Sequence, residues 1–170
     1  MLKYMITDPK YSLSEIFSAV KKHKPDFVCY RNKEYFNEDE IVEFCIFVKK
    51  YSKTIINLDS LKKEYLIKCF NGVHLPSAKL SLINRFKNKI VIASTHNEKE
   101  IFFAKNADFI TFSPVFDSKG RKGEGIDRLE EICKLHPNVF ALGGVVSDRE
   151  VEEIKKTTAV GFGSIRYFFT

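Results

Sequence analysis

Cationic side chains and glycines directly follow several short apolar runs in this sequence of 170 residues. Arg31 and Lys33 come at the end of the run at 26–31. Because they are two residues apart, they would point to the same side of an extended chain. Two cations on one side suit a phosphate or a diphosphate. Such a pair is also typical of solvated surface charge, and its position after a buried strand is what favours an anion site.

Two glycine-containing turns have the composition of a phosphate site. Gly143 and Gly144 lie in LGGV at 142–145, and Gly163 and Ser164 lie in GFGS at 161–164. Glycine allows backbone N–H groups to approach a ligand closely. Two tight turns without any ligand would have the same composition. Because both turns follow the last two apolar runs, we favour a phosphate site.

His96 is the candidate for proton transfer. It follows Ser94 directly after a predicted strand, and an imidazole exchanges protons near neutral pH. A lone histidine is also often a structural residue. His74, inside GVHL, is expected to face the core or a neighbouring strand and is the weaker candidate. His23 and His136 are placed at helix ends and are assigned no chemistry.

These residues need a scaffold that brings distant loops together. Short apolar runs predict strands at 2–7, 26–31, 54–58, 72–75, 89–94, 108–113, 139–144 and 159–164. Helical patterns between them predict helices at 12–23, 39–51, 60–69, 78–86, 98–106, 126–135 and 148–156.

The alternation of strands and helices predicts βαβ units and a parallel sheet. Eight units in residues 1–170 indicate a single-domain α/β protein, a compact (β/α)8 TIM barrel, in which all the segments after strands meet at one mouth. An open doubly wound sheet is the alternative, because such barrels usually need about 200 residues or more.

One segment raises a question of its own. Residues 112–125, FSPVFDSKGRKGEG, begin as a buried strand and continue as a loop of cations and glycines. The loop is either an ordinary surface turn or a segment that closes over an anion. Composition alone does not distinguish these alternatives.

Charge and composition limit the partners. The net charge of +6 is compatible with nucleic acid or with a small phosphorylated ligand. The aromatic residues fall at core spacing inside strands and helices, which argues against nucleic acid. No apolar run reaches the roughly 18 residues of a membrane span. Four widely separated cysteines are typical of reduced thiols, and we therefore expect a cytoplasmic protein.

Several segments resemble those of one known family. YMITDP, CYRNK, NGVHLPSAKL, the stretch from 90 to 117 and ALGGV occur in order and are similar to thiamine phosphate synthase and its relative TenI, the thiazole tautomerase. The resemblance covers essentially the whole chain and is most specific in residues 90–117. It implies a (β/α)8 barrel that binds a phosphorylated thiazole in thiamine biosynthesis.

The resemblance also implies roles for individual residues. The turns at 142–145 and 161–164 would hold the thiazole phosphate, and Arg31, Lys33 and Ser94 would lie where the synthase grips the diphosphate of its pyrimidine substrate. The loop at 112–125 matches the one that closes over that diphosphate. In this loop Ser118 and Lys122 keep a hydroxyl and a cation of the family pattern, while a second hydroxyl is lost.

The family's Mg²⁺ ligands are the largest departure. The synthase uses an Asn–Asp pair after the third strand and an aspartate after Gly-Val-His. Here Asn57 and Asp59 stand near the first position, and Lys79 replaces the aspartate at the second. An ammonium reverses the local charge where a hard cation needs oxygen ligands. We therefore expect no cofactor, with Mg²⁺ bound only if the protein acts as a synthase.

Three functions remain open on this basis. The first, which we favour from the sequence, is a metal-independent, TenI-like tautomerase in which His96 carries the proton transfer. The second is a Mg²⁺-dependent thiamine phosphate synthase with an altered metal site, in which Lys79 replaces part of the charge of Mg²⁺. The third is a non-catalytic barrel that binds a phosphorylated ligand. A homodimer is a further expectation, because a short barrel with many phenylalanines would cover apolar surface by self-association.

Overall fold

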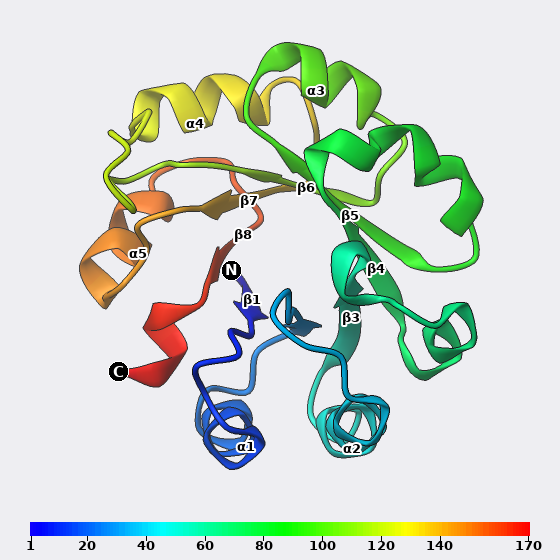
Figure 1. Ribbon diagram of the computed structural model, residues 1–170. Helices are drawn as coiled ribbons and strands as arrows, with labels where there is room; N and C mark the ends of the chain where they lie inside the picture. Colours follow the sequence, from blue (N-terminus) through cyan, green and yellow to red (C-terminus); the bar gives the residue numbers. More distant parts are fainter.

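The apolar runs form eight parallel strands that close into a barrel, and the computed structural model describes residues 1–170. The strand order is β1-β2-β3-β4-β5-β6-β7-β8, with β8 pairing with β1. Figure 1 shows the strands near the centre and the helices outside them. The predicted (β/α)8 barrel is confirmed, and the open sheet is excluded. The strands are β1 (Leu2–Ile6), β2 (Phe27–Tyr30), β3 (Lys53–Asn57), β4 (Gly72–Leu75), β5 (Ile90–Thr95), β6 (Phe109–Phe112), β7 (Val139–Leu142) and β8 (Gly161–Ser164).

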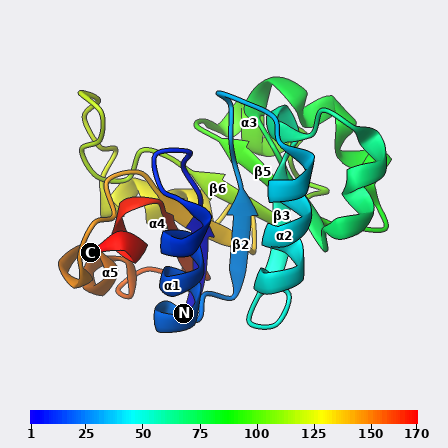
Figure 2. The ribbon, with the colours of Figure 1, turned by 60° about the horizontal axis from the view of Figure 1, so that its bottom comes forward.

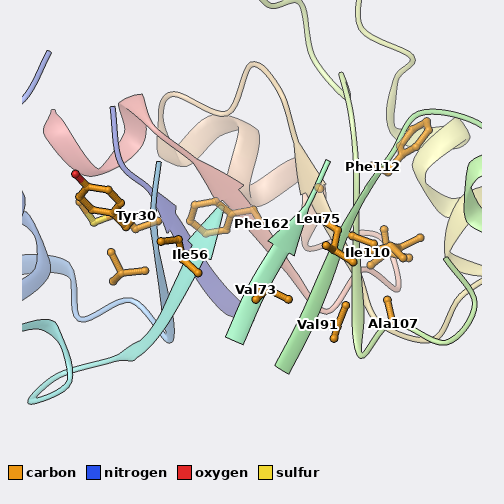
Figure 3. Packing of buried hydrophobic residues seen from close by; sticks show 14 of the residues in the cluster. Tyr30, Ile56, Val73, Leu75, Val91, Ala107, Ile110, Phe112 and Phe162 are labelled. Carbon is orange, nitrogen blue, oxygen red and sulfur yellow. The ribbon is translucent and has the colours of Figure 1, made fainter. Parts of the chain in front are cut away.

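Side chains alternate between the barrel interior and the layer beneath the helices, because successive residues of a strand point to opposite faces. A buried interior cluster is formed by Tyr4, Ile6, Phe27, Cys29, Ile55, Ile92 and Phe140. The larger outer core joins strand residues such as Val73, Leu75 and Ile110 to apolar residues of the helices. Figure 3 shows these three side chains on their strands. The strands are therefore covered on both faces, as their continuous apolar sequence requires.

Five α-helices follow the strands. Two of them begin with a capping box, Ser12 with Glu15 and Ser147 with Glu150, in which each side chain bonds the other residue's backbone. The C-terminal 3₁₀ turn η4 (Arg166–Phe169) packs on the first helix. The ring of Phe169 stacks on that of Tyr11, which precedes this helix, with the two ring centroids 3.6 Å apart. The helices are α1 (Leu13–His23), α2 (Glu38–Val48), α3 (Glu98–Phe103), α4 (Ile126–Cys133) and α5 (Asp148–Ile154).

The helices predicted at 60–69 and 78–86 are wrong in type. The chain forms 3₁₀ turns there: η1 (Leu58–Ser60), η2 (Glu64–Cys69) and η3 (Ser77–Phe86), the last broken at Lys79. A 3₁₀ helix rises about 2.0 Å per residue against about 1.5 Å for an α-helix. It therefore returns the chain to the next strand with fewer residues, which is how eight units fit into 170 residues.

Residues 113–125 form a projecting loop after β6. Ser118 and Arg121 pair across its tip, with Lys119 and Gly120 at positive φ between them. Figure 2 shows this yellow-green loop extending beyond the body of the barrel.

Two expectations, the homodimer and the cytoplasmic location, stay predictions. Phe102 and Phe103 on α3 are 65% and 58% exposed, so aromatic surface is present, and the homodimer stays a prediction. None of the helices is long and apolar enough to span a membrane. The cytoplasmic location also stays a prediction.

Candidate functional site

A cavity of about 670 Å³ opens at the carboxyl ends of the strands. Its lining carries six Lys and Arg side chains against one carboxylate, that of Asp8. This imbalance creates a positive potential in a concave site, which concentrates anionic ligands. The cations are Lys10, Arg31, Lys33, Lys119, Arg121 and Arg166.

The turn after β7 presents backbone donors to this cavity. Gly143 and Gly144 have φ values of +89° and +74°, a region that favours glycine. The N–H groups of Gly143, Gly144 and Val145 donate no hydrogen bond within the protein, although all three residues line the cavity. Unused donors at a cavity wall suit the oxygens of a phosphate.

Gly163 and Ser164 of β8 line the same part of the cavity. The Ser164 hydroxyl is already committed, because Oγ donates to the carbonyl of Val145 at 2.6 Å and accepts from the N–H of Tyr167. Ser164 therefore joins the end of β8 to the turn after β7. The two turns predicted to form one site thus lie on the same cavity, and the hydrogen bond from Ser164 to Val145 joins them.

The projecting loop explains why the turn after β7 needs two glycines. Its backbone bonds that turn directly, from Val115 N–H to Leu142 O and from Phe116 N–H to Gly143 O. A Cβ on Gly143 would lie 2.7 Å from Pro114 Cα, and one on Gly144 would lie 2.6 Å from Phe116 Cβ. The glycines thus serve the packing of the loop as well as the exposure of N–H groups.

Arg31 and Lys33 lie on another part of the cavity wall, after β2. The backbone N–H of Arg31 donates to Thr7 Oγ1 at 2.9 Å, which ties the end of β2 to β1. The Lys33 ammonium lies 3.1 Å from Oδ2 of Asp59. The predicted cationic pair therefore faces the cavity, with one cation partly neutralised.

Asp59 and Lys79 form an ion pair beside the cavity and are not part of its lining. The Lys79 ammonium is 2.7 Å from Oδ1 of Asp59, so both carboxylate oxygens face an ammonium. Burial alone would raise the pKa of Asp59, but the bonds from Lys79 and Lys33 outweigh it and lower that pKa. Asn57 lines the cavity, and its Oδ1 accepts from the N–H of Asp59.

His96 lies at the mouth and pairs with a carboxylate. Its Nδ1 is 2.9 Å from Glu100 Oε2, and its backbone N–H donates to the same oxygen at 2.7 Å. Nδ1 is therefore the nitrogen that Glu100 orients, which leaves Nε2 without a protein partner in a residue that lines the cavity. An imidazole held in this way can accept or donate a proton at Nε2.

His74 faces the barrel interior and the neighbouring strand β5, as expected from the sequence, and it also reaches the cavity. It is buried, yet it lines the cavity and bonds Ser94 at 2.7 Å through Nε2 and Tyr4 at 2.6 Å through Nδ1. Strict alternation in GVHL was the signal for its position, because Val73 and Leu75 point outwards into the helix layer.

The loop supplies different cations from the one expected. Lys119 and Arg121 line the cavity together with Ser118, whereas Lys122 is not part of the lining. The structure thus gathers ten of the residues singled out above: Arg31, Lys33, Asn57, Ser94, His96, Ser118, Gly143, Gly144, Gly163 and Ser164.

Comparisons with known structures agree with this architecture. Thiamine phosphate pyrophosphorylase from Pyrococcus furiosus superposes with a TM-score of 0.79 at 20% identity, over 96% of this chain and 85% of that chain. Phosphoribosyl anthranilate isomerase from Thermotoga maritima superposes with a TM-score of 0.68 at 13% identity, over 99% and 96% of the two chains. At such identities the likeness shows the shared fold.

Sequence comparison is more specific. The thiamine-phosphate synthase of Prochlorococcus marinus subsp. pastoris (strain CCMP1986 / NIES-2087 / MED4) is 29% identical over 155 residues, which cover 84% of this chain and 44% of that protein. The chain therefore spans less than half the length of this curated relative. A family model described as thiamine monophosphate synthase (TMP-TENI) matches residues 3–167. The chain belongs to that family.

Proposed function

We propose that this protein joins a pyrimidine diphosphate to a phosphorylated thiazole, the reaction of a thiamine phosphate synthase. One observation carries the proposal: a single cavity holds two separate regions suited to anions. The first is the set of unused N–H groups after β7, and the second is Arg31 with Lys33 after β2. In the closed order β8 and β1 lie between those strands. Two phosphorylated substrates would use both regions.

The charges fit the chemistry of that coupling. A bond forms between the thiazole nitrogen and the methylene carbon of the pyrimidine, and the bond from that carbon to the diphosphate oxygen breaks. The electron pair of the broken bond leaves with the diphosphate, whose negative charge grows. Arg31 and Lys33 supply fixed positive charge at one end of the cavity, and Lys119 and Arg121 can approach from the loop. Cations placed where charge develops lower the barrier.

The residues present do not fit the Mg²⁺ ion that the family resemblance implies. The carboxylate of Asp59 has an ammonium on each oxygen, and no group of three or more His, Cys, Asp or Glu side chains is placed to hold a metal. A hard divalent cation needs several oxygen ligands. Lys33, Asp59 and Lys79 together carry a net charge of +1, and we assign no step of the reaction to a metal.

A tautomerase acting on one phosphorylated thiazole is the second candidate, and His96 with Glu100 is the observation that favours it. Moving a double bond requires removal of a proton at one atom and delivery at another. An imidazole held through Nδ1 with Nε2 free can do both in turn. Family membership and the named synthase relative support the coupling reaction more directly, so we rank the tautomerase second.

The test is an assay of the purified protein by mass spectrometry. The coupling proposal expects thiamine phosphate and free diphosphate only when pyrimidine diphosphate and thiazole phosphate are both present. Conversion of the carboxylated thiazole phosphate by itself, without coupling, would support the second candidate instead. No product with either substrate set, from protein that still binds phosphate, would leave the non-catalytic barrel as the function.

A further inference from the structure

Three side chains form a hydrogen-bonded row across the barrel interior and end at the cavity. The hydroxyl of Tyr4 in β1 lies 2.6 Å from Nδ1 of His74 in β4, and Nε2 of His74 lies 2.7 Å from Oγ of Ser94 in β5. Tyr4 and His74 are almost fully buried, with exposed fractions of 0% and 3%. Ser94 lines the cavity beside the cations. The row therefore connects the closed interior to the ligand site.

His74 can carry only one ring proton in this position. Burial lowers the pKa of His74 to about 4, and the charges of Arg31 and Lys33 act in the same direction. The imidazole is thus neutral at pH 7, and one nitrogen donates while the other accepts. Two arrangements satisfy this condition. In one, Tyr4 donates to Nδ1 and the Nε2 proton points to Ser94. In the other, every bond of the row is reversed.

The phenol of Tyr4 decides between the two arrangements. Its proton needs an acceptor, because the ring is buried among Phe27 and Phe140. Burial also raises the pKa of Tyr4 well above its usual value, so the phenol keeps its proton. Apart from Nδ1, its polar neighbour is the thiol of Cys29, and sulfur is a weak acceptor. The arrangement in which Tyr4 donates to Nδ1 therefore leaves no buried donor without a partner.

We propose that Tyr4 and His74 are positioning residues that set Ser94 as a hydrogen-bond donor into the cavity. When Nε2–H donates to Oγ, the hydroxyl proton of Ser94 has no acceptor in the protein and is available to the ligand. A phosphate or diphosphate oxygen accepts that proton. A hydrogen-bond donor of a ligand at the same place would face the Ser94 hydroxyl proton and form no hydrogen bond with it. This inference rests on the proposed function in taking the ligand as an anion.

The tautomer of His74 is directly measurable. In protein labelled with ¹⁵N-histidine, two-bond correlations identify the protonated ring nitrogen of each of the four imidazoles. We expect the Nε2–H form for His74 at pH 7. His136 is the internal reference, because its Nδ1 accepts from the N–H of Asn138 and its Nε2 faces the carbonyl of Ala107. An Nδ1–H form at His74 would overturn the assignment, and this measurement needs no variant.

The Tyr4→Phe substitution then tests the cause. It keeps the ring and removes the proton that Nδ1 accepts, so we expect the ¹⁵N resonance of Nδ1 at His74 to move towards that of an unbonded ring nitrogen, while His136 stays unchanged. An unchanged Nδ1 resonance at His74 would show that Tyr4 does not donate to this nitrogen. Circular dichroism of the same sample checks that the barrel is intact.

Binding of inorganic diphosphate, measured by calorimetry, tests the consequence. We expect Ser94→Ala to weaken binding by about ten-fold, the loss of one hydrogen bond to a charged group, and Tyr4→Phe to weaken it by a smaller factor, because the imidazole then holds Ser94 less firmly. The double variant should bind no more weakly than Ser94→Ala, because Tyr4 acts through Ser94. If Tyr4→Phe weakened binding in the Ser94→Ala background by the same factor as in the wild-type protein, the positioning role would be overturned. If the wild-type protein bound no diphosphate, the proposed function would fail, while an Nε2–H form at His74 would still support the role of Tyr4.

Discussion

Nζ of Lys79 lies 2.7 Å from Oδ1 of Asp59, twenty residues earlier in the chain. The two residues follow different strands, and the barrel brings η1 and η3 to the same rim. Lys33 binds the other carboxylate oxygen. The carboxylate is thus already bound to two ammonium groups. This relationship is the structural reason for assigning no metal to the site.

Magnesium should therefore have no specific effect on the wild-type protein. We expect equal melting temperatures in MgCl₂ and in NaCl of matched ionic strength, without diphosphate, which would itself bind the metal. Lys79→Asp places a second carboxylate beside Asp59, and Mg²⁺ should then raise the melting temperature by roughly 2–4 °C. Lys79→Gln is the control, since it removes the charge without adding a ligand. Magnesium-specific stabilisation of the wild-type protein would contradict the prediction.

Loss of either cation after β2 should weaken diphosphate binding. We expect Arg31→Gln and Lys33→Gln to raise the dissociation constant by roughly 10- to 100-fold, since each removes a charged donor from the cavity wall. Calorimetry with inorganic diphosphate measures the effect. Lys53→Gln is the matched control, because Lys53 is exposed at the opposite end of β3. An equal loss in Lys53→Gln would indicate a general effect of net charge.

Alanine should be tolerated much better at Gly120 than at Gly143. Both glycines have positive φ, so both substitutions incur backbone strain of about 1 kcal/mol or more. Only at Gly143 does the new Cβ meet backbone, at 2.7 Å from Pro114 Cα, while nothing lies within 4 Å at Gly120. We expect Gly143→Ala to lower the free energy of unfolding, measured with urea, by a further 1–3 kcal/mol or so. Equal free energies of unfolding would show that the loop does not pack on this turn.

Stability should fall in mild acid because of His74. Its pKa is about 4 in the folded protein against 6.5 as the ordinary value. As the pH falls below about 6.5, the unfolded chain binds a proton that the folded protein does not accept until about pH 4. The free energy of unfolding therefore decreases across this window, by about 3 kcal/mol at most.

Urea unfolding at pH 7.5 and pH 4.5 measures this decrease, and His74→Gln isolates the contribution of one imidazole. Gln keeps a donor and an acceptor but does not titrate. We expect the variant to lose less stability than the wild-type protein between the two pH values. Identical losses would mean that other groups account for the acid sensitivity.

Removal of His96 separates the two candidate functions. A tautomerase should lose about 100-fold or more of its rate in His96→Asn, because proton transfer by a positioned group supplies that factor. Glu100→Gln should give a smaller loss through poorer orientation of the ring. Lys99→Gln, an exposed neighbour on α3, is the control. Coupling activity that survives His96→Asn would place the imidazole outside the synthase reaction.

The barrel itself was predictable because local patterns imply it. Each apolar run was long enough for one covered strand, and five of the seven helices predicted from helical spacing are α-helices in the structure. Arg31 and the Gly143–Gly144 turn could be placed at one mouth because parallel strands all end on the same side. The 3₁₀ turns before and after β4 were missed, since helical periodicity in ten residues does not reveal how far the chain must travel.

The sequence by itself determined the number of units, the alternation of interior and exterior side chains, and a glycine- and cation-rich rim. Tertiary structure alone decided which side chains meet across the barrel. Tyr4 and His74 are 70 residues apart, and Asp59 and Lys79 follow different strands. Hydrogen bonds and ion pairs act over only a few ångströms, so closure of the barrel decides which of these groups become partners.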